Sequence, residues 1–139
     1  MGQGMGGIKR FEDIEGWQKA RELAKAVYAM TNAGDFARDF GLKDQMRRAV
    51  VSVMSNIAEG YGRGGNKEFL QYLSQAKGSA AEVQAQLYVA LDAGYLSKHD
   101  FDHLYSLADS TASVIAGLMR YLAQSDLKGP KYHHAGRTA

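Results

Sequence analysis

A glycine-rich segment, Gly60-Tyr-Gly-Arg-Gly-Gly65, has the G-x-G-x-x-G spacing of a dinucleotide-binding loop. That spacing binds a pyrophosphate where the loop follows a β-strand and opens a helix in a βαβ unit. Here it follows a helical pattern, and Lys67 lies one residue too late for a Walker loop. We therefore predict a flexible joint between two helices. A weak anion site, formed by Arg63, Lys67 and the next helix N-terminus, is the alternative interpretation.

A second candidate is His99-Asp-Phe-Asp-His103, which places two histidines four residues apart, as in zinc-binding helices. Aspartate replaces the glutamate of the zincin pattern, the segment opens a helix, and a third ligand is missing. The simpler interpretation is that Asp100 and Asp102 are first-turn acids favoured by the helix dipole. We expect no metal and no cofactor. A hydrolase that uses His99, His103 and Asp100 is a remote alternative.

Composition excludes several other kinds of chemistry. The 139 residues include no cysteine, so there is no disulfide, thiol nucleophile or iron–sulfur site. No serine or carboxylate pair stands in a pattern typical of a nucleophile with its base, so we expect no enzyme. Apolar residues make up 45% of the chain without a run long enough to span a membrane, which favours a cytoplasmic protein of one domain.

Four segments carry apolar residues at three- and four-residue steps: 17–31, 42–61, 69–91 and 101–122. We expect Asp13, Asn66 and Ser97 to cap helices, and Gly34 and Gly94 to end them. The pattern predicts an all-α fold, an antiparallel up-down four-helix bundle over residues 9–125. Residues 1–8 are expected to form a flexible leader and residues 126–139 a disordered basic tail.

The third helical segment has a second stripe, opposite its apolar face, that is small and uncharged. At 100° per residue its members are Ser74, Gly78, Ala81 and Ala85. A mid-helix glycine costs about 1 kcal/mol relative to alanine, which close approach of another backbone would explain. The second segment has a matching stripe, whose members are Gln45, Arg48, Ser52, Asn56, Glu59 and Arg63. We interpret these stripes as a homo-oligomer interface, with Glu59 and Arg63 paired; an ordinary solvated face is the alternative.

The charges are unevenly distributed along the chain. Residues 43–77 hold six basic and three acidic side chains, whereas residues 92–126 hold two basic and five acidic ones. In an oligomer, Arg47, Arg48, Arg63 and Lys67 are candidates for a basic ring or groove that holds a nucleic-acid backbone. A polarised surface without such a partner is the alternative.

The segments Gln45–Ser52 and Ser55–Arg63, which contain Arg-Arg-Ala and Asn-Ile-Ala-Glu-Gly-Tyr-Gly-Arg, carry a family resemblance. Phe11-Glu-Asp13, Trp17-Gln18, Glu68-Phe69, Ala76–Ser79 with Glu82, and Gly94-Tyr-Leu96 extend it. Over residues 8–125 the chain resembles the bacterial four-helix bundle proteins encoded in intervening sequences of large-subunit ribosomal RNA genes. Val53-Met54 stands where that family often has proline, which should straighten the helix slightly.

That family is similar to the accessory proteins of diversity-generating retroelements. Those proteins are homopentamers with a basic surface that bind nucleic acid and a reverse transcriptase. The resemblance implies a pentamer here; the number five comes from it alone. We therefore expect a non-enzymatic homo-oligomer that binds RNA, or else DNA, through a basic surface. The second hypothesis is an interaction scaffold whose partner is another protein.

Overall fold

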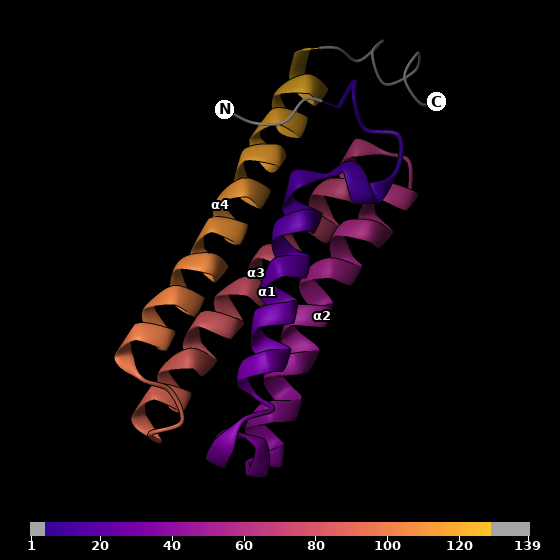
Figure 1. The fold of residues 1–139 in the computed structure, drawn as a ribbon. Helices are drawn as coiled ribbons and strands as arrows, with labels where there is room; N and C mark the ends of the chain where they lie inside the picture. Colours follow the sequence, from indigo (N-terminus) through magenta and orange to yellow (C-terminus); the bar gives the residue numbers. More distant parts are fainter. Residues whose placement is uncertain (1–4, 129–139) are drawn as a thin grey trace.

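The computed structural model describes residues 5–128, which form four α-helices and two short 3-10 helices without a β-strand. The helices are α1 (Glu15–Met30), α2 (Phe40–Gly62), α3 (Asn66–Asp92) and α4 (Lys98–Lys128), with η1 (Phe11–Asp13) and η2 (Gly34–Arg38) flanking α1. The α1–α2 and α3–α4 connections lie at the lower end of Figure 1, and the α2–α3 connection lies at the upper end. The all-α, four-helix prediction is confirmed.

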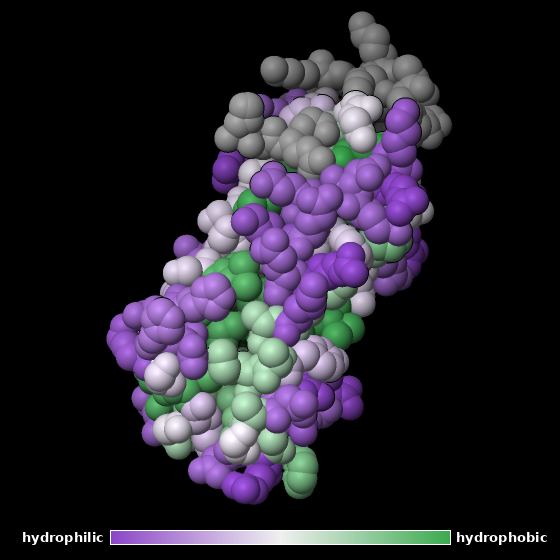
Figure 2. All heavy atoms as spheres, viewed as in Figure 1, coloured by the Kyte–Doolittle hydropathy of each residue, from purple (hydrophilic) through white to green (hydrophobic). Residues whose placement is uncertain are grey.

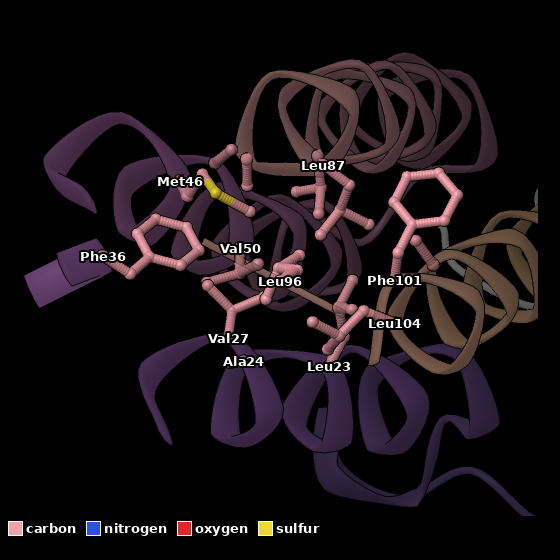
Figure 3. Close-up of a cluster of buried hydrophobic side chains, with 14 residues drawn as sticks. Leu23, Ala24, Val27, Phe36, Met46, Val50, Leu87, Leu96, Phe101 and Leu104 are labelled. Atoms are coloured by element: carbon pink, nitrogen blue, oxygen red, sulfur yellow. The ribbon is translucent and has the colours of Figure 1, made fainter. Parts of the chain in front are cut away.

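Each helix buries most of the apolar face that its periodicity predicts. The core has two clusters, one toward each end of the molecule, and Met54 packs against both. Figure 3 shows the cluster near the α1–α2 connection, where Leu23, Val50 and Leu104 point toward one another from three helices. Figure 2 shows hydrophilic side chains along the outward side of α1, with apolar side chains reaching the surface beside and below them.

The observed helix caps differ in part from those expected. Ser97 Oγ accepts from the Asp100 amide at 3.0 Å, and Gly94 ends α3 with φ +81°, both as predicted. The N-cap of α1 is Ile14 rather than Asp13, whose carboxylate instead accepts the Lys9 amide at 3.0 Å. The N-cap of α3 is Gly65 rather than Asn66, because α3 starts one residue earlier than expected and Asn66 is its first helical residue.

Two further boundaries shift. Helix α1 ends at Met30 with Thr31 as its C-cap, four residues before the expected stop at Gly34, which has φ +57° at the start of η2. Helix α4 continues to Lys128, so residues 126–128 of the expected tail are helical, and residues 129–139 lie outside the described residues.

The expected leader is described only from residue 5 onward. Met5 and Ile8 pack against the second core cluster, and the Tyr61 hydroxyl donates to the Ile8 carbonyl at 3.3 Å. Residues 1–4 lie outside the described residues. The last residues of the expected leader therefore contact the bundle.

Candidate nucleic-acid interface and oligomer surface

Arg47 of α2 is half-buried and binds groups at the end of α1. Its Nε donates to Thr31 Oγ1 at 3.0 Å, and its Nη2 donates to the Tyr28 carbonyl at 3.3 Å. The guanidinium also lies 4.3 Å from the centre of the Tyr28 ring. Because the last carbonyls of a helix have no partner within it, Arg47 satisfies one and stabilises the negative end of the α1 dipole.

Arg48, one residue further along α2, is exposed. Its Nε donates to Asp44 Oδ2 at 2.8 Å, a pair one helical turn apart. The hydrogen bond to this carboxylate raises the pKa of Arg48 above its usual range, so the group is charged at every accessible pH. Arg48 therefore offers a permanent charge at the surface, although part of it is offset by Asp44.

Arg63 forms the pair with Glu59 that the sequence predicts, and a third side chain joins it. Arg63 Nη2 donates to Glu59 Oε2 at 2.9 Å and to the Tyr72 hydroxyl at 2.8 Å, and that hydroxyl donates to Glu59 at 3.3 Å. The hydrogen bond to Glu59 is the largest cause of a raised pKa at Arg63. The cluster ties the last turn of α2 to α3. Tyr72 is not singled out by the sequence pattern.

The four predicted basic residues form two groups rather than one patch. Lys67 is exposed in the first turn of α3, at the same end of the molecule as Arg63. Arg47 and Arg48 lie sixteen and fifteen residues before Arg63 on α2. At 1.5 Å of rise per residue, the two groups are about 24 Å apart along the helix. Within one chain they do not converge on one phosphate.

The predicted small-residue stripe on α3 lies fully on the surface. Its four members, Ser74, Gly78, Ala81 and Ala85, are all exposed. A Cβ added at Gly78 would meet no atom within 4 Å, so nothing within the described chain explains the glycine. The stripe is therefore available for a partner, although its exposure does not identify one.

Two predicted interface residues on α2 are used within the chain. Ser52 Oγ and Ser79 Oγ are 2.9 Å apart, which joins α2 to α3. Asn56 Nδ2 donates to the Ser52 carbonyl at 2.9 Å and to Ser52 Oγ at 3.0 Å. Both side chains are half-buried, so their polar groups stabilise the α2–α3 contact. Glu59, in the Arg63 cluster, remains exposed at the edge of this face.

The histidine motif lies on the surface at the start of α4, where His99 and His103 are both exposed. Lys98 holds Asp102 through contacts of 2.7 and 2.9 Å. Among residues 5–128, no group of three potential ligands is close enough to hold a metal ion. Within that same range no helix is both long and apolar enough to cross a membrane.

Sequence reasoning missed an exposed pair of aromatic residues near Arg47. Tyr28 is one of the apolar positions in the helical pattern of residues 17–31, which predicts its burial. This prediction is wrong, because 41% of Tyr28 is exposed. Phe40 is 72% exposed in the first turn of α2. The sequence does contain a sign of this exposure. Phe40 precedes the apolar pattern that begins at Leu42, and it does not fit the three- and four-residue spacing of that pattern.

The helices and their surfaces define an all-α protein with four α-helices in its described residues. Residues 12–117 match the family described as 23S rRNA-intervening sequence protein, so the chain belongs to that family. A crystal structure of a protein of unknown function from the S23 ribosomal protein family of Bacteroides thetaiotaomicron has a similar fold, with a TM-score of 0.68 at 17% identity. The match covers 75% of this chain and 97% of that one. No curated protein matches the chain.

Proposed function

We propose that the chain is an antiparallel up-down bundle that assembles into a homo-oligomer, a pentamer, and binds RNA through a basic surface without catalysing a reaction. The direction of the helices is supported by two contacts between α2 and α3. Ser52 meets Ser79, whereas Glu59, seven residues further along α2, meets Tyr72, seven residues earlier on α3. The cytoplasm, where RNA partners are abundant, is the compartment that goes with this proposal.

The proposed assembly is supported by one observation, the exposed stripe of small residues around Gly78. Small uncharged residues along more than three turns of α3 let a second backbone approach closely. Burying this face in an interface would remove few charged groups from water. A closed ring requires that the face on one chain meets a complementary face on the next. The excess of basic residues at 43–77 and of acidic residues at 92–126 supplies such complementarity.

RNA binding is supported by the basic residues and by what assembly would do to them. Arg47 and Arg48 lie on α2, Arg63 is its C-cap residue, and Lys67 lies at the start of α3. Repetition around a ring would place the two groups, about 24 Å apart in one chain, beside those of neighbouring copies. A surface that neutralises several phosphates binds more weakly as salt rises.

The deciding experiment measures solution mass by multi-angle light scattering, with and without a mixed RNA pool, at low and high salt. We expect a pentamer that gains mass with RNA only at low salt. If four phosphates are neutralised, the logarithm of the binding constant should fall with the logarithm of salt with a slope of about −3. A monomer that ignores RNA would contradict both parts of the proposal.

The second candidate function is a scaffold for another protein. Two of the four basic side chains, Arg48 and Arg63, are paired with carboxylates of the same chain, which reduces the charge they offer to a nucleic acid. A stable oligomer that ignores RNA at every salt concentration would favour this second function.

A further inference from the structure

The surface where α1 ends and α2 begins carries exposed aromatic rings. Phe40 is 72% exposed, the largest exposed fraction among the described large apolar residues, and Tyr28 is 41% exposed. Exposed apolar groups that gather beside polar ones commonly mark a binding surface. Val51, 43% exposed, adds to the same region of α2.

Each ring has a cation beside it. Lys43 Nζ lies 5.6 Å from the centre of the Phe40 ring, and Arg47 lies 4.3 Å from that of Tyr28. Two open hollows, of about 520 and 530 Å³, adjoin here and share Asp44 and Arg47 in their walls. Phe40 and Lys43 line the first hollow. Tyr28 and Arg48 line the second, together with Val51 and Ser52.

The charge of this surface is positive. The two hollows are lined by three basic residues, Lys43, Arg47 and Arg48, and by one acidic residue, Asp44, whose carboxylate is held by Arg48. Two more carboxylates lie in the connection between α1 and α2, and only the first has a cationic partner, so the three basic residues still outnumber the carboxylates that no other cation offsets. Asp35 pairs with Arg38, and Asp39 accepts the Leu42 amide and the Tyr95 hydroxyl. An anion in these hollows therefore meets net positive charge beside exposed aromatic faces.

We propose that these hollows bind single-stranded nucleic acid, with a base stacked on Phe40 and the adjacent phosphates held by Lys43 and Arg48. This inference rests on the proposed function and gives it a chemical class of ligand and a place. Proteins that bind single strands combine aromatic side chains, on which bases stack, with basic groups that follow the nucleic-acid backbone. Every unpaired base presents a flat face for such stacking. A duplex fits less well, because its bases are already stacked on one another. A protein partner also fits less well, because the centre of a protein–protein interface is poor in charged residues.

The test uses the full chain and a fluorescently labelled 12-nucleotide oligouridine, with a blunt RNA duplex of the same length for comparison. Phe40→Ala should weaken oligouridine binding about 5- to 150-fold, the range for loss of one base–aromatic stack. Duplex binding should change less than twofold. Tyr121→Ala removes another exposed aromatic residue, on α4, and is the matched control with no expected effect.

Two more variants separate stacking from plain apolar contact. Phe40→Leu keeps an apolar side chain without a flat ring and should bind as weakly as Phe40→Ala. Phe40→Trp should bind at least as well as the natural chain, and its fluorescence should be quenched by oligouridine; the natural chain, whose one tryptophan is Trp17, measures the background. Because Phe40 is largely exposed, circular dichroism should show the same helix content in all variants.

The outcomes separate this inference from the proposed function. Selective loss of oligouridine binding in Phe40→Ala supports both. RNA binding that Phe40→Ala and Phe40→Leu leave unchanged overturns the Phe40 site and leaves the proposed function standing. Equal loss for duplex and single strand overturns the preference for unpaired bases. If the natural chain binds no RNA, and Phe40→Leu instead impairs binding of a protein, both the Phe40 site and the proposed function are overturned.

Discussion

Gly60 shows how a single absent side chain sets the distance between two helices. It is buried where α2 passes α3, and a Cβ there would lie 2.6 Å from Tyr72 Cβ and 3.0 Å from Phe69 Cδ1. Real Cβ atoms do not approach so closely, so any larger residue must push the helices apart. The same closeness brings the Tyr72 hydroxyl within reach of Glu59 and Arg63.

Gly60→Ala should therefore lower the free energy of unfolding by about 1–3 kcal/mol, the usual range for overpacking a tight core contact. Gly62→Ala is the matched control, because it lies in the same helix and its Cβ would meet nothing within 4 Å. That substitution should be neutral or stabilising by up to about 1 kcal/mol. Urea unfolding followed by circular dichroism measures both. Equal stability of the two variants would contradict the account of Gly60.

Asp39 links stability to acidity at the start of α2. Its carboxylate accepts the Leu42 amide at 3.1 Å and the Tyr95 hydroxyl at 2.9 Å, and these bonds, the amide first, lower its pKa. A lowered pKa in the folded state means that the group stabilises the fold above the pKa it has when unfolded, about 3.9. That contribution is lost as the pH falls through the lower, folded value.

Asp39→Ala should therefore lower the melting temperature most at neutral pH, and the difference from the natural chain should shrink as the pH falls below about 4. Thermal unfolding at several pH values between about 7 and about 2.5 measures it. A difference that stays constant across this range would show that the charge of Asp39 does not stabilise the fold.

Among the elements, α1 is the shortest of the four α-helices, with 16 residues, and its C-terminal end is held by neighbouring residues. Thr31 closes its last turn by donating from Oγ1 to the Val27 carbonyl at 2.7 Å, and Arg47 of α2 binds Thr31 and Tyr28. Arg47 thus holds two helices together, and its loss affects packing as well as surface charge.

Arg47→Ala should lower the free energy of unfolding by about 1 kcal/mol, since it removes two hydrogen bonds and the contact with the Tyr28 ring. Arg48→Ala is the control one residue away: it removes a similar charge from an exposed pair and should leave stability unchanged. Chemical unfolding of both variants measures the difference. Reduced RNA binding in Arg48→Ala then reports on binding alone, whereas Arg47→Ala mixes binding with stability. Equal stability of the two variants would remove the structural role from Arg47.

For the whole molecule, a substitution in the α3 stripe tests assembly without disturbing the fold. Because nothing lies within 4 Å of a Cβ at Gly78, Gly78→Leu should fold as well as the natural chain. A leucine on a closely approached face should split the oligomer into smaller species, which light scattering measures. Glu22→Leu, on the exposed side of α1, is the control and should leave the mass unchanged. An unchanged mass for Gly78→Leu would exclude this stripe as the interface.

Much of the fold could be predicted because helical periodicity is a local signal. Met46, Val53, Leu73, Leu104 and Ile115 are all buried as their spacing predicts. The Glu59–Arg63 pair was predictable for the same reason, since residues four apart on a helix are neighbours. Caps were less predictable: Asp13 serves the preceding turn, and Ile14 takes the N-cap position of α1 without a side-chain bond.

Residue spacing along the chain predicts the all-α class, the four helices and most of the faces they bury, because each depends on residues within a few positions of one another. The contacts of the polar groups depend instead on the packing of the helices, that is, on the tertiary structure. It placed Tyr72 beside Arg63, paired Ser52 with Ser79, turned Arg47 toward the end of α1 and left Phe40 uncovered. Each of these depends on which surfaces of separate helices meet and how closely, and residue spacing along one helix carries no information about that.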